Sequence, residues 1–307
     1  MILALVFPGQ GSQSSTMLDA FENIESFQNT IQKASDILNY DITEVVKDEM
    51  KLNNTIYTQP VILAVSYAIS EIFKTECNPK IHIAAGHSLG EYSALVSNNT
   101  IDFTTGLLLV KKRAELMSKA MDNIDSGMAA VIGLDGDIVN KICEASTKAH
   151  EVIEAVNFNC PGQTVIAGHS VAIDKIAPIL KNEGAKIVKK LPVSIAAHTS
   201  LLKSVADELK NELQNIVFND NTFDIIHNYD LSISQSGKDL QNVLAKQVCS
   251  PVRWIETLEK FKLNNITDII EVGPGNILSG LVKRFDKSIV VHSTKTMEDI
   301  KMLAQAL

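Results

Sequence analysis

The sequence predicts an α/β protein built around a parallel sheet, with a smaller antiparallel module inserted into the chain. Short apolar runs closed by Gly or Pro alternate with helical stretches, which is typical of buried parallel strands joined by helices. A central stretch departs from this alternation. The chain has 307 residues, 45% of them hydrophobic, which is near the upper limit for a single core. We therefore expect a core made of residues 1–124 and 197–307 and a subdomain at residues 125–196.

The first third of the chain supplies two of the expected strands. Pro60 stands where an apolar helix is expected to open, because a residue without an N–H is tolerated in a first helical turn. Asp102 has the position of a helix N-cap. In order, we expect a strand at 2–7, helical segments within 17–47, a helix at 61–73, a strand at 81–85, a helix from 88 and a helix at 102–121.

The central stretch has the order βαββαβ, the split βαβ or ferredoxin-like unit. Gly162, Gly168 and Gly184 mark its joints. The expected elements are strands at 128–134, 152–158, 163–167 and 185–191, and helices at 137–148 and 171–182. Beyond it the alternation resumes, with helices at 199–214, 237–248, 252–263 and 276–285, strands at 268–272 and 289–292, and a terminal helix. The segment 219–236 is expected to be a loop.

The composition excludes several classes of function. The net charge of −8 argues against nucleic-acid binding, because a polyanion requires a basic surface. No apolar run approaches the roughly 18 residues of a membrane helix, and the apolar start of the chain is too short for a signal peptide. The four cysteines follow no disulfide or zinc-binding spacing. These features predict a cytoplasmic protein with reduced thiols, without a membrane segment or a metal site.

Residues 86–90 read Gly-His-Ser-Leu-Gly and match the G-x-S-x-G pattern of a nucleophile elbow. An apolar strand precedes the pattern and a helix follows it. In that context a serine on the sharp turn exposes its hydroxyl at a helix N-terminus, where the N–H of Leu89 would face a developing oxyanion. A serine that merely caps the helix is the alternative. The context favours Ser88 as a nucleophile.

A serine nucleophile needs a base, and the chain has seven histidines. His87 adjoins the serine, and we expect its side chain to point away. His198 lies where the inserted module ends and the core resumes, and clefts form at such junctions. A structural role for His198 is an equally good interpretation at this point, and His227 is the next candidate for the base.

Two further positions are suggestive but open to simpler interpretations. Gln10 lies in a glycine-containing loop after the first strand, where a backbone can approach a ligand closely, although a plain connecting loop would look the same. Arg113 lies on the helix at 102–121. Its guanidinium could hold a carboxylate in two-point contact, although an arginine there is more often a surface residue.

Taken together, the sequence resembles the malonyl-CoA:acyl carrier protein transacylase family of fatty-acid synthesis and, more widely, the acyltransferase domains of polyketide synthases. The resemblance covers essentially the whole chain. It is carried by FPGQGSQ at 7–13, QP at 59–60, AGHSLGEYSAL at 85–95, KKRAELM at 111–117, GMAAVIGL at 127–134, NFNCPGQTVIAG at 157–168, LPVS at 191–194, QVCSPVRW at 247–254 and EVGPGNILSGLVKR at 271–284.

This resemblance implies an α/β-hydrolase-like core with a ferredoxin-like subdomain, and it implies roles by matching position. Ser88 is the nucleophile and His198 the general base, oriented by backbone carbonyl groups rather than by a carboxylate. The oxyanion lies between the backbone N–H groups of Gln10 and Leu89. Arg113 holds the malonyl carboxylate. Gln247 also belongs to the site. The residues before His198, Ala196 and Ala197, lack the aromatic side chain common in malonyl-selective polyketide domains.

The implied reaction is malonyl transfer from malonyl-CoA to acyl carrier protein through a Ser88 ester. It needs no metal or bound organic cofactor, since CoA enters as the leaving group of a substrate. Three alternatives stay open: a serine hydrolase such as a thioesterase, a non-catalytic carrier-binding protein, and transfer of a bulkier dicarboxylic acyl group. Acyl carrier proteins are acidic, so docking on a chain of charge −8 requires a local basic patch. The candidates are Lys189, Lys190, Lys283 and Arg284.

Overall fold

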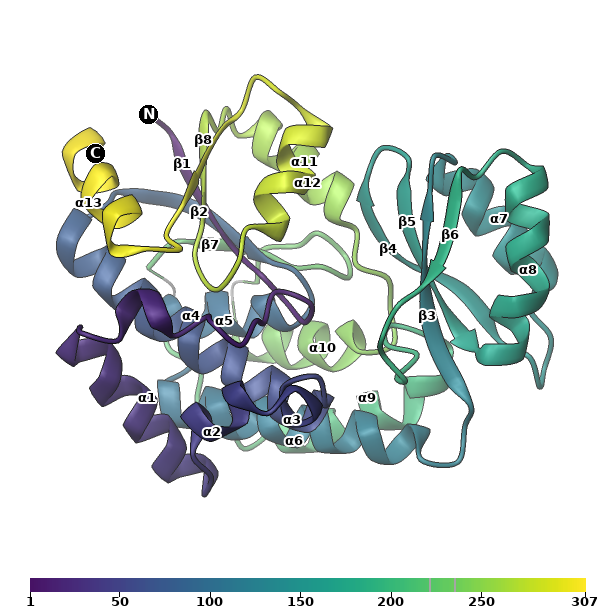
Figure 1. Cartoon of the computed structure of the whole chain (residues 1–307), viewed down its shortest axis with the longest axis horizontal. Coiled ribbons are helices and arrows are strands. Elements are labelled where there is room, and N and C mark those ends of the chain that lie inside the picture. Colours follow the sequence, from purple (N-terminus) through teal and green to yellow (C-terminus); the bar gives the residue numbers. More distant parts are fainter. Residues whose placement is uncertain (221, 235) are drawn as a thin grey trace.

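A five-stranded parallel sheet forms the centre of the larger part of the molecule (Figure 1). The computed structural model describes residues 1–220, 222–234 and 236–307. The strand order is β7-β2-β1-β8-β9, and each neighbouring pair is parallel. The strands are β1 (Leu3–Phe7), β2 (Ile81–Gly86), β7 (Asp224–Ile226), β8 (Asp268–Glu271) and β9 (Val290–Ser293).

Strand β7 is the one part of this sheet that falls where a loop was expected. It lies in the segment 219–236, of which residues 221 and 235 fall outside the described part of the chain. The strand has only three residues; it pairs with β2, and its last residue, Ile226, also forms an isolated antiparallel bridge with Ile233. So short a run carries no detectable periodicity, yet its carboxyl end lies beside that of β2, where the G-x-S-x-G motif begins.

Helices cover both faces of the parallel sheet, because alternate residues of its central strand point to opposite sides. Leu5 and Phe7 of β1 pack into one apolar cluster with residues of the long helices, whereas Val6 packs into a second cluster around Trp254. Two short 3₁₀ helices, η1 (Asp19–Phe21) and η2 (Ser200–Leu202), complete this part. Its α-helices are α1 (Glu25–Leu38), α2 (Ile42–Lys47), α3 (Glu49–Leu52), α4 (Thr55–Cys77), α5 (Leu89–Ser97), α6 (Phe103–Met121), α9 (Lys203–Leu213), α10 (Gly237–Gln247), α11 (Trp254–Leu263), α12 (Ile277–Phe285) and α13 (Met297–Ala306).

Helix α4 begins at Thr55, so the expectation that Pro60 opens it is wrong. The side chain of Asn54 accepts a hydrogen bond from Ile56 N–H at 3.1 Å and caps the helix five residues earlier than expected. By length and composition α4 is the one helix in the described residues that could cross a membrane, which the sequence analysis overlooked. Its most apolar 18-residue window is 78% buried inside the protein, as in a core helix.

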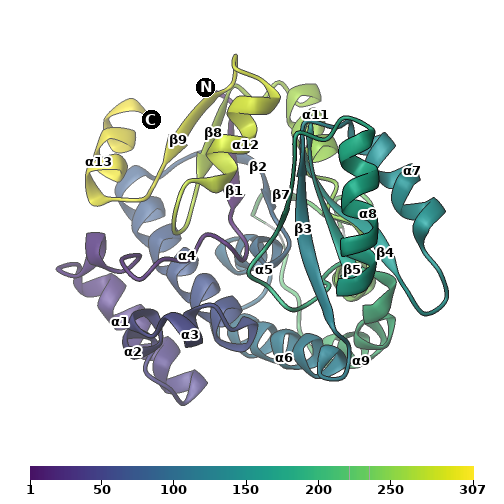
Figure 2. The same ribbon diagram turned by 45° about the vertical axis from the view of Figure 1, so that its right-hand side comes forward.

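A four-stranded antiparallel sheet forms the smaller part. Its order, β4-β5-β3-β6, is that of a ferredoxin-like unit. Figure 2 shows helices α7 (Gly136–Ser146) and α8 (Ser170–Asn182) together on one face of this sheet. Its strands are β3 (Ser126–Ile132), β4 (Ile153–Cys160), β5 (Gln163–His169) and β6 (Ile187–Lys190). The predicted fold class, a parallel α/β core with an inserted antiparallel unit, is therefore confirmed.

Backbone hydrogen bonds tie the antiparallel sheet to the segment between α10 and α11 of the larger part. Val252 forms a parallel bridge with Asn157 of β4. Its N–H donates to the carbonyl of Val156 at 2.8 Å, and its own carbonyl accepts from Phe158 N–H at 3.0 Å. Because the segment around residue 250 is held in this way, it lies close to the point where the chain returns from the antiparallel sheet at residues 191–199.

Candidate active site

Ser88 lies at the sharp turn between β2 and α5. Its backbone has φ 53° and ψ −109°, a conformation that costs a non-glycine residue energy and that functional sites retain. Both glycines of the motif are needed because neighbouring backbone atoms leave no room for a side chain. A Cβ on Gly86 would lie 1.8 Å from the carbonyl carbon of Gly90, and one on Gly90 would lie 2.0 Å from the carbonyl oxygen of Phe7. The predicted strand–turn–helix geometry around Ser88 is therefore present, and the turn packs directly against the end of β1.

Asn228 holds this turn in place, and the sequence analysis missed it. Its Oδ1 accepts from the N–H of Ser88 at 2.6 Å, and its Nδ2 donates to the carbonyl of Gly86 at 2.6 Å. Asn228 is buried and follows β7 by two residues. Its position after the end of a parallel strand is a signal of a binding edge, but only once β7 is recognised as a strand.

His198 faces Ser88, with its Nε2 at 2.7 Å from the serine Oγ. Its Nδ1 lies 2.8 Å from the carbonyl oxygen of Gln247 and 3.1 Å from that of Ser250. Carbonyl oxygens only accept, so Nδ1 carries the proton and Nε2 accepts from the serine hydroxyl. No carboxylate is needed to set this tautomer.

The imidazole of His198 is a weak proton acceptor in the free protein. Burial, and after it the positive charge of Arg113, lowers the pKa of His198 to about 3. The residue is 2% exposed and has φ 66°. Both members of the Ser88–His198 pair thus adopt positive φ, and both are neutral at ordinary pH.

Arg113 is buried beside this pair, with 1% of its surface exposed. It projects from α6 and donates from NH2 to Ser88 Oγ at 3.3 Å and to Gln247 Oε1 at 3.1 Å. Its NH1 donates to Gln59 Oε1 at 2.5 Å. Burial lowers the pKa of Arg113, and the nearby Tyr92 and Glu91 oppose that effect. The simpler interpretation of Arg113 as a surface residue does not hold.

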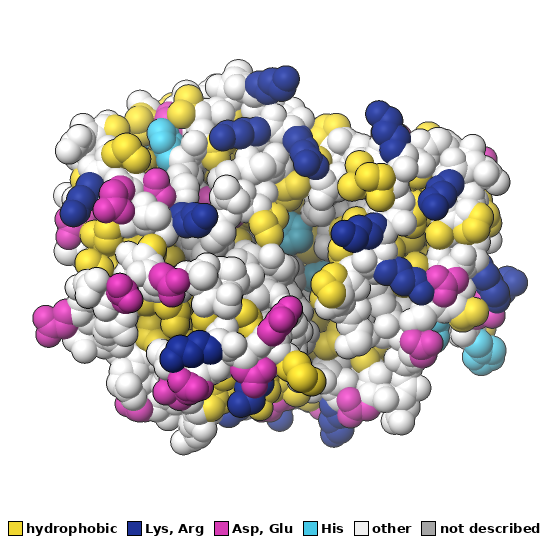
Figure 3. Space-filling model, in the orientation of Figure 1, with side chains coloured by type: hydrophobic (Ala, Val, Ile, Leu, Met, Phe, Trp, Pro, Cys, Tyr) yellow, Lys and Arg dark blue, Asp and Glu magenta, His cyan; other side chains and the backbone are white. Residues whose placement is uncertain are grey.

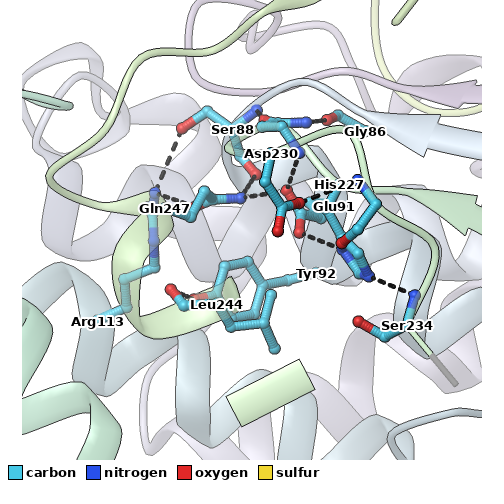
Figure 4. Close-up of polar contacts among 12 residues, drawn as sticks. Gly86, Ser88, Glu91, Tyr92, Arg113, His227, Asp230, Ser234, Leu244 and Gln247 are labelled. Atoms are coloured by element: carbon cyan, nitrogen blue, oxygen red, sulfur yellow. Dashed lines mark hydrogen bonds and ion pairs between the residues drawn. The ribbon is translucent and has the colours of Figure 1, made fainter. Parts of the chain in front are cut away.

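Gln59 and Glu91 also belong to this site, although the sequence analysis gave neither a role. Gln59 entered the sequence analysis only as part of the motif QP at 59–60. Glu91 follows Ser88 by less than one helical turn and is fully buried. Figure 4 shows its carboxylate below Ser88, between His227 and Gln247. Its carboxylate bonds to Nδ1 of His227 at 2.7 Å. The structure therefore places His198 against Ser88, and His227 against Glu91.

Gln10 and Leu89 both line the cavity at Ser88. Leu89 is the first residue of α5, so its N–H has no acceptor within the helix. The loop that contains Gln10 packs onto the elbow so closely that a Cβ on Gly9 would lie 2.4 Å from the carbonyl oxygen of His87. The Gln10 side chain is anchored to Thr55 Oγ1 at 3.1 Å. The backbone N–H groups of Gln10 and Leu89 therefore belong to two segments in direct contact.

A cavity of about 200 Å³ lies between the two sheets at Ser88. Apolar side chains such as Met117 and Met128 form much of its wall, with a few polar groups among them, as in sites for small organic ligands. A more polar cavity of about 550 Å³ adjoins it and shares Thr55 and Pro192 with it. Among the described residues, no group of three or more His, Cys, Asp or Glu side chains could hold a metal ion.

His87 contributes to the wall of the cavity, but its ring bonds to Asn159 Oδ1 at 2.8 Å and not to Ser88. The four basic candidates are exposed residues of β6 and α12. Lys190 pairs with Asp174 at 2.7 Å, and Arg284 donates to Gln163 at 2.6 Å. On the face shown in Figure 3, Lys and Arg side chains gather above and to the right of a central hollow in which histidine is visible.

Comparison with known proteins agrees with this geometry. Residues 4–302 match the family model of the acyl transferase domain. A malonyl CoA-acyl carrier protein transacylase of Haemophilus influenzae is 41% identical over 285 residues, 92% of this chain and 91% of that protein. A solved transacylase of the same name from Coxiella burnetii is 36% identical, covers 100% of this chain and 98% of its own, and has a TM-score of 0.97.

A further solved structure holds a malonyl-transacylase in complex with its type II polyketide synthase acyl-carrier protein. It is 35% identical, covers 100% of both chains and has a TM-score of 0.97. These likenesses extend over the parallel core, the antiparallel unit and the cavity between them. The chain therefore belongs to the acyl transferase domain family, among the malonyl CoA-acyl carrier protein transacylases.

Proposed function

We propose that this chain transfers a malonyl group from malonyl-CoA to the phosphopantetheine thiol of acyl carrier protein, by way of an ester on Ser88. The observation that carries the proposal is the placement of a buried arginine beside a serine–histidine pair. Arg113 NH2 lies 3.3 Å from Ser88 Oγ, and His198 Nε2 lies 2.7 Å from the same atom. A thioester carbonyl at Ser88 and a free carboxylate at Arg113 are the two ends of a malonyl group.

In the first half-reaction, Ser88 Oγ attacks the thioester carbonyl while its proton passes to His198 Nε2. The oxyanion that forms is stabilised by the N–H groups of Gln10 and Leu89. When the C–S bond breaks, the CoA thiolate takes the proton from His198. The products are malonyl-Ser88 and CoA.

In the second half-reaction, His198 accepts the proton of the carrier's thiol, and the sulfur attacks the ester carbonyl. The C–O bond to Ser88 breaks, and Oγ regains a proton from His198. Since every proton passes through His198 and CoA is only a leaving group, the scheme needs no metal or bound organic cofactor. We place the reaction in the cytoplasm, in keeping with four free thiols.

Selection of the acyl group follows from the environment of Arg113. Malonyl-CoA presents a carboxylate that can accept from the guanidinium in two-point geometry. Acetyl-CoA is smaller but leaves the buried cation without an anionic partner. A ligand that lacks one methylene group binds less well by about 1–3 kcal/mol. A ligand that leaves a buried charged group of the site unpaired is rejected far more strongly.

The experiment that tests the proposal is the intact mass of the protein after mixing with malonyl-CoA alone. We expect a malonyl adduct that is absent from Ser88→Ala, weak with acetyl-CoA, and lost when holo acyl carrier protein is added. Steady CoA release without an adduct would instead identify a hydrolase. If the protein forms no adduct and releases no CoA, that result would contradict acyl transfer from malonyl-CoA.

A further inference from the structure

Glu91 is a buried carboxylate beneath the nucleophile elbow, and the proposed chemistry gives it no part. It is 0% exposed. One of its oxygens accepts from His227 Nδ1 at 2.7 Å, and the other accepts from Asn228 N–H at 3.1 Å and from Gln247 Nε2 at 2.7 Å (Figure 4). Burying an anion is costly unless its acceptor sites are satisfied. Three donors converge on this carboxylate, which is the environment that a buried anion requires.

His227 acts here as a neutral hydrogen-bond donor and supplies no positive charge. Its Nε2 accepts from the backbone N–H of Ser234 at 3.3 Å, so the ring proton is on Nδ1, which faces Glu91. The cation nearest to Glu91 in this network is therefore Arg113, on the other side of a single amide group.

That amide belongs to Gln247, and its orientation is determined by Glu91. Gln247 Nε2 donates to Glu91 Oε2 at 2.7 Å and to the carbonyl of Ser88 at 2.9 Å. Both groups are acceptors, so the NH₂ end must face them and the oxygen must face the other way. The oxygen, Oε1, accepts from Arg113 NH2 at 3.1 Å. If the amide turned round, an NH₂ group would face the guanidinium.

Arg113 consequently contacts neutral oxygens, and among the described residues it touches no carboxylate. Its partners are Gln59 Oε1, Gln247 Oε1 and Ser88 Oγ. Its Nε–H has no hydrogen-bond partner within the described part of the chain. A carboxylate in direct contact would occupy the donors that an incoming anion needs. A carboxylate one amide away offsets the buried charge, leaves Nε–H unpaired and keeps the other donors on neutral acceptors that an anion can replace.

We propose that Glu91 is a positioning residue for acyl-group selection: through Gln247 it aims Arg113 and balances its charge from a distance, so that the guanidinium is held ready for a substrate carboxylate. This inference rests on the proposed malonyl transfer and deepens it. Glu91 touches neither substrate nor the reacting atoms.

Glu91→Gln tests the orientation. The variant amide has nearly the same shape, but one of its two ends becomes a donor facing either His227 or the Gln247 amide, so the network cannot be satisfied as it stands. We expect the ratio of malonyl to acetyl kcat/KM to fall about tenfold or more, mainly through a higher KM for malonyl-CoA. A folded variant with an unchanged ratio overturns the proposal, whatever its absolute rate.

A charge-swapped variant, Glu91→Gln with Gln247→Glu, keeps the test decisive even if the single variant fails to fold. It retains one buried carboxylate and one amide but puts the carboxylate against Arg113. If Glu91 served only to balance charge, the swap would restore malonyl preference, and that result would overturn the proposal. We expect the preference to stay about tenfold below that of the unaltered protein, because the new carboxylate occupies the clamp.

The failure of this inference is distinguishable from the failure of the proposed function. The unaltered protein is tested first, and the absence of a malonyl adduct there refutes malonyl transfer itself. If that protein prefers malonyl-CoA and both variants keep the same preference, malonyl transfer stands and the role of Glu91 falls.

Discussion

Ser88 and His198 both have positive φ, at 53° and 66°, which costs a side-chain-bearing residue about 1–3 kcal/mol. The surroundings hold both in place. Asn228 bonds to both sides of the serine turn, and the carbonyl of Val248 accepts from His198 N–H at 2.9 Å. Residues in a locally unfavourable backbone conformation, held there by partners distant in the chain, are typical of functional sites.

Arg113→Ala should shift the acyl preference from malonyl-CoA toward acetyl-CoA. Removing the guanidinium takes away the partner of the malonyl carboxylate but leaves the Ser88–His198 pair. We expect malonyl transfer to fall by about a hundredfold or more, with a relative gain for acetyl transfer. Steady-state rates with both thioesters measure the two effects. An unaltered malonyl-to-acetyl ratio would remove Arg113 from the clamp.

The buried, neutral state of His198 should destabilise the protein in mild acid. Its folded pKa of about 3 lies below its unfolded value of about 6.5, so in this window the unfolded chain binds more protons and stability falls as the pH falls. From pH 7.5 to 5.5 the loss is about 1.4 kcal/mol for one such group. We therefore expect His198→Gln to lose that much less than the unaltered protein in urea unfolding. Equal losses would contradict the burial of a neutral imidazole.

At the scale of elements, the contact between the β2–α5 turn and the end of β1 positions the whole site. Gly90 lets these backbones touch, and His87 N–H donates to the carbonyl of Phe7 at 2.9 Å. The same contact brings the loop with Gln10 against Leu89. The geometry of the proposed oxyanion site thus depends on two packed segments.

Gly90→Ala should disrupt this packing. The added Cβ would lie 2.0 Å from the carbonyl oxygen of Phe7, a backbone atom that cannot move aside cheaply. We expect a loss of about 1–3 kcal/mol in free energy of unfolding together with loss of acyl-enzyme formation. Gly280→Ala is the matched control. It lies in α12 with no atom within 4 Å of an added Cβ, so a gain of about 0.5–1 kcal/mol is expected. Equal effects of the two changes would argue against the close contact.

Much of this architecture was predictable, because strand–turn–helix patterns and glycine motifs are local in sequence. The elbow with Ser88, the antiparallel unit and most helices belong to this class. Asn228 and the Glu91–Gln247 contact could not be predicted, since these pairings join residues 140 and 156 positions apart. The start of α4 was misplaced for another reason. Proline is tolerated inside this helix, and the capping side chain is Asn54.

At the scale of the whole molecule, an acidic chain must receive an acidic carrier. The net charge is −8, yet exposed lysines occur on β6 and α12. We expect Lys189→Glu and Lys283→Glu each to raise the apparent KM for acyl carrier protein several-fold and to leave the KM for malonyl-CoA unchanged. Lys301→Glu makes the same change of charge on α13, which lies at the opposite end of the molecule from the antiparallel sheet (Figure 1), and is the control. A lysine variant that behaves like this control is not at the docking surface.

Gln247 serves two purposes through two different parts of one residue. Its backbone carbonyl orients His198, and its side-chain amide contacts Arg113. A substitution of Gln247 replaces the side-chain amide but leaves the backbone carbonyl in place. Substitutions at this position can therefore alter which acyl group is accepted while the base keeps its orientation. Over the evolution of such a protein, the accepted acyl group could therefore change through this position without an intermediate that has lost the orientation of His198.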